Sequence, residues 1–106
     1  MNANDHKVLS RLKRLLKCRL PVYEIVLFGS RARGDAAPDS DMDVLVVLNA
    51  PVTRQYRDTA MDCAWEVGFD ADIVIVPVVV YHDAWKSRQQ QDSLLALAIR
   101  EEGIPV

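Results

Sequence analysis

Two aspartates stand at the start of a segment that otherwise has the composition of a buried β-strand. Residues 42–48 are apolar apart from Asp43, and Asp41 directly precedes them. Side chains at positions i and i+2 of a strand point to the same face of a sheet, so the two carboxylates lie side by side. Leu45 and Val47 continue that face into the core. Because neighbouring like charges repel and a buried carboxylate is unfavourable, this placement requires a compensating cation.

A divalent metal ion is the natural cation for such a pair. Carboxylate oxygens are hard ligands that suit Mg²⁺, which keeps waters and substrate phosphates as its other ligands. The alternative is a structural one, in which the pair caps the junction of loop and strand and one carboxylate accepts backbone N–H groups. The metal interpretation is preferred because it accounts for both charges.

A third aspartate repeats the pattern in the next apolar segment. Residues 71–76 are predicted to form a third strand that ends at Pro77, and Asp72 lies within it. Asp70 has the same parity and is a rival, but Asp72 is preferred because an unpaired charge inside the apolar run has least access to water. Three carboxylates on neighbouring strands could hold two metal ions, which activate an attacking oxygen and stabilise a leaving one.

A glycine–serine turn follows the predicted strand at residues 22–28. Gly29 allows the backbone to approach a ligand closely, and Ser30 offers a hydroxyl where a short helix begins, whose free N–H groups attract phosphate. Arg31 and Arg33 could add positive charge, and which of them reaches phosphate stays open. Beside the aspartate pair, this turn predicts a site for a nucleoside triphosphate.

Helical periodicity predicts the elements around these strands. Residues 5–20 carry an apolar stripe opposite basic side chains, with Asn4 or Asp5 able to cap the start and Pro21 ending the helix. The basic face is either a contact surface for an acidic partner or RNA, or an ordinary solvated face.

Three further helices are expected, which settles the fold class. They cover residues 53–68, with Trp65 in the core, a short stretch at 80–88, and residues 92–102, ended by Gly103. Helices and strands in this order predict an α/β (α+β) fold with a three- to four-strand mixed sheet and helices packed on it.

Size and composition are those of one globular domain, covering residues 1–106. Half of the residues are hydrophobic, about a quarter are charged, and the net charge of −2 does not favour nucleic acid or membrane as a partner. No apolar run approaches the ~18 residues of a membrane span, and no secretory signal is present. Cys18 and Cys63 are interpreted as buried small hydrophobes in a reducing compartment, so a cytoplasmic location is expected.

The spacing of the glycine–serine turn and the aspartate pair resembles the signature of the polymerase-β-type nucleotidyltransferase superfamily. The fuller strings at 29–35 and 39–43 are similar to those of its minimal nucleotidyltransferases, many of which are antitoxin partners of HEPN-domain ribonuclease toxins. The resemblance implies a polymerase-β-like nucleotidyltransferase fold, two Mg²⁺ sites and ATP as substrate. In antitoxin members it implies transfer of AMP to a tyrosine of the HEPN toxin.

The resemblance also implies roles for single residues. Gly29 and Ser30 match the residues that hold the triphosphate. Asp41 and Asp43 match the two metal-bridging carboxylates. Asp72 matches the third carboxylate, which helps to activate the acceptor hydroxyl.

Two other functions stay open. The chain could be a non-catalytic antitoxin that neutralises its partner by binding alone, or its acceptor could be a small molecule or RNA. The catalytic core uses nearly the whole chain, so the acceptor is expected on another protein rather than on nucleic acid. Exposed apolar surface could receive that protein, with Tyr81, Trp85 and residues 92–102 as candidates, although an ordinary core position is the preferred interpretation of each.

Overall fold

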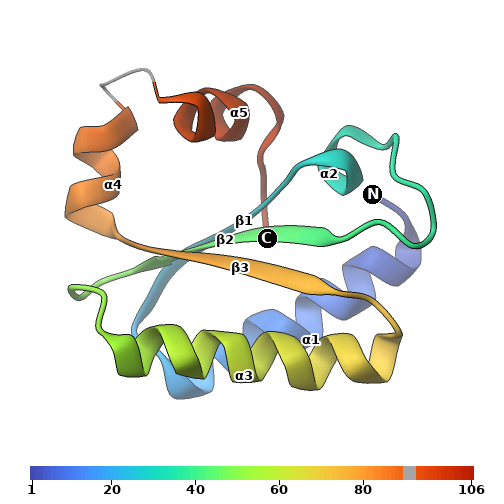
Figure 1. The fold of residues 1–106 in the computed structure, drawn as a ribbon, viewed down its shortest axis with the longest axis horizontal. Coiled ribbons are helices and arrows are strands. Elements are labelled where there is room, and N and C mark those ends of the chain that lie inside the picture. Colours follow the sequence, from blue (N-terminus) through green and yellow to red (C-terminus); the bar gives the residue numbers. More distant parts are fainter. Residues whose placement is uncertain (90–92) are drawn as a thin grey trace.

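The protein is described from a computed structural model, which covers residues 1–89 and 93–106. A four-stranded sheet with the strand order β3-β2-β1-β4 lies at its centre (Figure 1). β1 is antiparallel to both β2 and β4, whereas β3 is parallel to β2. The mixed sheet expected from the sequence is therefore confirmed. The elements in chain order are α1 (Ala3–Arg19), β1 (Val22–Phe28), α2 (Ser30–Arg33), β2 (Met42–Leu48), α3 (Arg54–Ala71), β3 (Ile75–Tyr81), α4 (His82–Gln89), α5 (Leu94–Glu102) and β4 (Ile104–Pro105).

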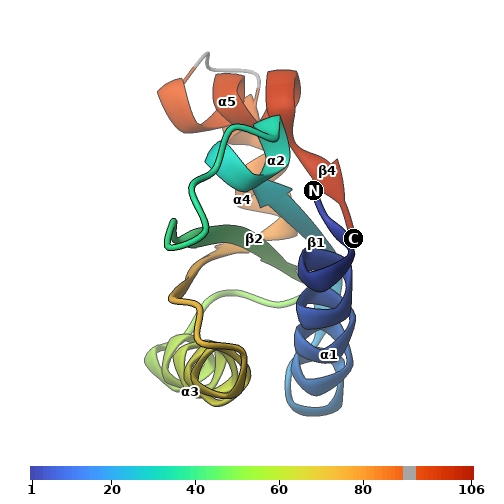
Figure 2. The same ribbon diagram turned by 90° about the vertical axis from the view of Figure 1, so that its right-hand side faces the viewer.

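Helices cover both faces of the sheet. α1 and α3 lie side by side against one face, and α4 and α5 lie on the other (Figures 1 and 2). The larger apolar cluster joins the first pair of helices to alternate sheet residues such as Leu27, Val44 and Val46. The smaller cluster joins Leu45 and Val47 to the second pair. Successive side chains of β2 thus enter different cores, which explains why this strand is apolar along almost its whole length.

The first two predicted strands are confirmed with their bounds, and their pairing positions the site. Antiparallel register sets Phe28, the last residue of β1, opposite Asp43 near the start of β2. The Gly29 turn therefore follows directly beside the aspartate pair. Two segments separated along the chain by a polar loop thus meet at one end of the sheet.

The prediction of a third strand at residues 71–76 is wrong in its bounds. α3 continues past Gly68 to Ala71, and β3 runs from Ile75 to Tyr81 with Pro77 inside it. β3 is an edge strand, and the N–H of Met42 donates to the carbonyl of Val74. In a parallel ladder alternate residues face the neighbouring strand, so the nitrogen of Pro77 points to the open edge. There its missing N–H breaks no ladder bond, and the strand continues through it.

Helix α1 begins earlier than expected. Asn2 caps it by accepting the N–H of Asp5, so neither Asn4 nor Asp5 is the cap. Asp5 lies inside the first turn and is buried. On the basic face, Arg11 and Lys13 have intramolecular partners in Asp70 and the Val106 carbonyl.

The two C-terminal helices are confirmed as elements. The expected helix at 80–88 is α4, and the expected helix at 92–102 is α5, with position 92 outside the described residues. Ser93 caps α5 by accepting the N–H of Ala96, and the N–H of Gly103 closes its other end on Ile99. In the described part of the chain, no helix combines the length and apolar character that membrane crossing needs.

Two burial expectations are wrong. Trp65, expected in the core, is 72% exposed. Trp85 is buried, which agrees with its expected core position and removes it as a candidate for exposed surface. Cys18 is exposed, whereas Cys63 is buried as predicted. The prediction for Trp65 was wrong because helical periodicity assigns a wide side of α3 to the core. The sheet and α1 cover only part of that side, and Trp65 lies on the remainder.

Candidate functional site

The aspartate pair lies where the sequence predicts it. Asp41 is exposed directly before β2, and Asp43 is half-buried in β2, on the face shared with Leu45 and Val47. Neither carboxylate makes a hydrogen bond or an ion pair with another residue in the ranges 1–89 and 93–106. Among the described residues, the two adjacent carboxylates therefore have no lysine, arginine or histidine side chain bonded to them.

The electrostatics of Asp43 reflect this situation. Burial and, secondarily, the charge of Asp41 raise the pKa of the Asp43 carboxyl, while the charge of Arg33 opposes the rise. A raised carboxyl pKa means that the ionised form is disfavoured where it stands. A cation placed between the two carboxylates would reverse that effect.

Gly29 brings the turn after β1 directly against this pair. Its backbone has φ +79° and ψ −159°, a conformation that side-chain-bearing residues rarely adopt. A Cβ at this position would also collide with Oδ2 of Asp43. The glycine is therefore required twice, for its backbone conformation and for the space that it leaves open beside the carboxylate.

Ser30 opens α2 immediately after this turn. Its backbone carbonyl accepts the N–H groups of Gly34 and Asp35, which closes the short helix. Its hydroxyl has no hydrogen-bond partner among the residues that the structure describes. The hydroxyl and the first amides of α2 are thus free to contact a ligand beside the carboxylates.

Arg33 is the arginine that faces this site. Its guanidinium pairs with Asp35 at 3.3 Å and with Oε2 of Glu102 at 2.9 Å, and the Glu102 hydrogen bond is the main cause of its raised pKa. Its charge also acts on Asp43. Sequence reasoning missed Glu102, since a partner on α5 leaves no local signal.

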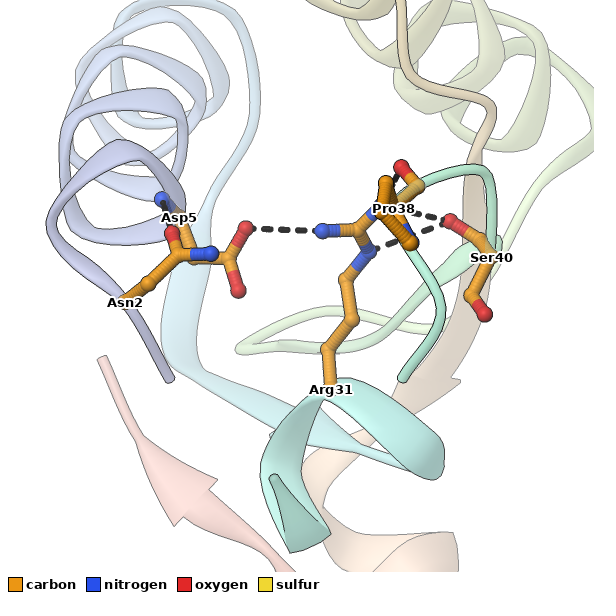
Figure 3. A network of polar contacts seen from close by, with 5 residues as sticks. All are labelled: Asn2, Asp5, Arg31, Pro38 and Ser40. Carbon is orange, nitrogen blue, oxygen red and sulfur yellow. Dashed lines mark hydrogen bonds and ion pairs between the residues drawn. The ribbon is translucent and has the colours of Figure 1, made fainter. Parts of the chain in front are cut away.

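Arg31 does not face the site, which corrects the expectation that it adds charge at phosphates. Its side chain is 5% exposed and bonds Asp5 of α1 at 2.8 Å (Figure 3). The same guanidinium donates to the carbonyls of Pro38 and Ser40. The planar fork of arginine can bind all three groups at once. Arg31 therefore fastens the loop that precedes Asp41 to the start of α1.

Asp72 is not placed in a strand, which corrects the third-carboxylate expectation. It ends α3 in the left-handed conformation, with φ 57° and ψ 41°, and is exposed. Aspartate tolerates this conformation, so the helix can run past Gly68 and end here. Its rival Asp70 pairs with Arg11 at 2.7 Å. Within the described ranges, no three His, Cys, Asp or Glu side chains form a group that could hold a metal ion.

The donor set fits a divalent cation. Two oxygen-bearing side chains at Asp41 and Asp43 are what Mg²⁺ uses when phosphates and waters complete its coordination. The space beside Asp43, which a Cβ on Gly29 would fill, leaves room for a ligand. Asp72 ends α3 and does not join this pair in a group of three ligands among the described residues.

Comparisons with known proteins identify the family and the fold. A family model described as nucleotidyltransferase domain matches residues 7–103. A protein of Methanocaldococcus jannaschii named putative protein adenylyltransferase MJ0141 is 32% identical over 68 residues, which are 64% of this chain and 67% of that protein.

Solved structures share the fold. A toxin–antitoxin crystal structure with AMP-PNP matches with a TM-score of 0.66 at 19% identity, covering 91% of this chain and 69% of that one. A structure of a tri-AMPylated Shewanella oneidensis HEPN toxin in complex with MNT antitoxin matches with a TM-score of 0.52 at 16% identity, covering 96% and 67%. The fold class expected from the sequence is therefore confirmed.

Proposed function

Because the chain belongs to the nucleotidyltransferase domain family, we propose that it transfers AMP from ATP to a tyrosine of a HEPN-domain toxin and so acts as its antitoxin. Membership of the family makes the chain a nucleotidyltransferase enzyme, as the glycine–serine and aspartate spacing indicated. The observation that carries the proposal is the unpaired Asp41–Asp43 carboxylates beside the Gly29–Ser30 turn.

The choice of acceptor is supported by the relatives. One is named a protein adenylyltransferase, and one structural neighbour is an antitoxin bound to an AMPylated HEPN toxin.

In this proposal each site residue has one task. Asp41 and Asp43 would hold Mg²⁺, which when bound neutralises charge on the phosphates. The amides that follow Gly29 and the hydroxyl of Ser30 would bind the β- and γ-phosphates, and Arg33 would add positive charge there. Asp72 has no place in this set, because it lies at the end of α3.

The reaction is an in-line displacement at the α-phosphorus. The tyrosine oxygen forms a bond to that phosphorus, its proton is released, and the bond to the bridging oxygen of the β-phosphate breaks. Pyrophosphate leaves with the bonding electron pair, and AMP stays on the toxin. The chain's contribution is to position the phosphates and stabilise their charge, the main source of catalysis in phosphoryl-type transfer.

Mass spectrometry of a purified HEPN-domain partner, incubated with the chain, ATP and Mg²⁺, tests the proposal. We expect the partner to gain AMP on a tyrosine, and Asp41→Asn or Asp43→Asn to abolish the gain. Asp39→Asn, an exposed neighbour outside the pair, is the matched control and should retain it.

Two outcomes would support the other functions. If a variant with both Asp41→Asn and Asp43→Asn still neutralises the partner at low concentration with no mass gain, the chain is a binding antitoxin. If label from ATP appears on a small molecule or RNA and never on protein, the acceptor is wrong.

A further inference from the structure

An apolar groove on α3 is left uncovered by the other elements that the structure describes. Met61, Trp65 and Phe69 on α3 are 54%, 72% and 72% exposed, and Val74 before β3 is 64% exposed. The rings of Trp65 and Phe69 contact each other with centroids 5.8 Å apart. Together these four residues border a groove of about 590 Å³, here called the α3 groove. Contiguous exposed apolar side chains of this size mark an interaction surface rather than ordinary surface variation.

Three acidic residues, here called the acidic rim, lie along or beside the α3 groove, and Asp72 lines it directly. Asp58 and Asp62 precede Trp65 and Phe69 on the same outward stripe of α3, and Asp72 follows them at the helix end. None of these three carboxylates has an ion pair or side-chain hydrogen bond with a residue in the described ranges. The other acidic residues of the second half of α3 differ, since Glu66 and Asp70 pair with arginines of α1.

We propose that the α3 groove binds an amphipathic helix of a partner protein, with apolar side chains seated on Trp65 and Phe69 and lysine or arginine side chains over the acidic rim. Charge complementarity selects the basic flanks, and the aromatic pair supplies the kind of anchor that dominates binding energy. The inference rests on the proposed function only in taking the acceptor protein as the owner of this helix.

A strand is a poorer occupant than a helix. A partner strand would have to pair with the open edge of β3, but the nitrogen of Pro77 points to that edge and has no proton to donate. The exposed apolar groups of the groove are instead side chains of a helix and of the segment leading into β3. They suit the side-chain knobs of a helix lying in a groove.

A second copy of this chain is also a poorer occupant. A symmetric contact through the groove would bring the Asp58 and Asp62 carboxylates of both copies together, where they would repel. The basic face of α1 has the right charge, but in the described residues α1 exposes no large apolar side chain.

The α3 groove lies at the same end of the sheet as the transfer site, although α3 packs on the opposite face from the Asp43 side chain. Val74 borders the groove, and its carbonyl accepts the N–H of Met42, the residue between Asp41 and Asp43. A helix seated in the groove would therefore be held at the same end of the sheet as the carboxylate pair. This assigns to Asp72 a role in partner binding, in place of the catalytic role expected from the sequence.

Fluorescence anisotropy with a labelled synthetic helix tests the surface by itself. The peptide carries Leu at i, i+3, i+4 and i+7 with Lys at its flanks, and a matched peptide carries Glu in place of Lys. We expect the Lys peptide to bind and Trp65→Ala or Phe69→Ala to weaken it at least about tenfold. Leu94→Ala, which truncates an 87% exposed leucine on α5, is the control and should change nothing.

Charge reversal makes the test specific. A variant with Asp58→Lys and Asp62→Lys should bind the Glu peptide better than the Lys peptide. Equal affinity of both peptides for the unaltered chain, or equal loss in Leu94→Ala and Trp65→Ala, would overturn the proposal. So would a self-association of the chain in sedimentation that Trp65→Ala abolishes, because the groove would then serve a second copy.

A purified HEPN-domain partner separates this inference from the proposed function. Trp65→Ala should raise the KM for the partner while kcat at saturation is kept, whereas Asp43→Asn should keep the complex and lose transfer. If Trp65→Ala leaves binding and transfer unchanged, the inference fails and the proposed function stands. If it abolishes the complex but the unaltered chain never transfers AMP, the proposed function fails and the inference stands.

Discussion

Removal of the Asp5 carboxylate should destabilise the protein and loosen its site together. In Asp5→Ala the guanidinium of Arg31 stays buried, since the two side chains are 4–5% exposed, but it loses its 2.8 Å partner. Leaving one member of a buried ion pair without the other costs about 3–5 kcal/mol. That is a large part of the roughly 5–15 kcal/mol by which a domain of this kind is stable.

The loss can be measured by urea denaturation followed by circular dichroism. Asp5→Ala should lower the free energy of unfolding by about 3–5 kcal/mol, and Arg31→Met should lower it by a similar amount. The double variant Asp5→Leu with Arg31→Met should lose clearly less than the sum of the single variants, because no uncompensated charge stays buried. A matched control is Arg11→Met, which removes an exposed ion pair worth about 0–1 kcal/mol.

The same network reaches the site through the loop. Arg31 donates to the carbonyls of Pro38 and Ser40, so its loss frees the segment directly before Asp41. We therefore expect the double variant, even where stable, to bind Mg²⁺–ATP more weakly in calorimetry. The reasoning is refuted if Asp5→Ala loses less than about 1 kcal/mol, the range of an exposed pair.

Four further changes test the site. Asp43→Asn should increase the free energy of unfolding at pH 7 while abolishing transfer. The pKa of the Asp43 carboxyl is raised in the folded protein, so the neutral carboxyl is the form that stabilises the fold. Its contribution to stability is lost as the pH rises through that pKa, which urea denaturation at a series of pH values measures. Asp41→Asn should lower the Asp43 pKa by removing a like charge, measured by carbon-13 NMR titration of the Asp43 carboxyl, and an unchanged titration would contradict the pairing. Gly29→Ala should lower the free energy of unfolding by roughly 1–3 kcal/mol because of the φ of +79°, and its clash with Asp43 should weaken Mg²⁺ binding. Gly34→Ala, at φ +83° but with open space around it, should affect stability alone. Glu102→Gln should raise the KM for ATP with little change in thermal stability, because it releases Arg33 from an ion pair at the protein surface. A loss of stability with an unchanged KM would mean that the Arg33–Glu102 contact is purely structural.

Local sequence carried much of the information about the site. β1 and β2 follow from their runs of apolar and β-branched residues. The proximity of Asp41 to Asp43 follows from the period of two in an extended backbone. The glycine at position 29 was predictable as well, because a turn between a strand and a helix selects a residue without Cβ. The carboxylate pair and the turn beside it were therefore determined by short stretches of chain.

Other features depend on which elements meet in space, and no local pattern contains them. Arg31 and Arg33 lie in the same short segment of sequence. Arg31 is buried against Asp5 of α1, whereas Arg33 faces the site and pairs with Glu102 on α5. Trp65 has core spacing on its helix, but it lies on a side of α3 that no other element in the described ranges covers. Asp72 was predicted to lie in a strand because the helix was expected to end at Gly68, whereas α3 continues to Ala71. The packing of helices on the sheet decides which of these side chains are buried and which partners they meet, because burial is a property of the assembled layers and not of the residue.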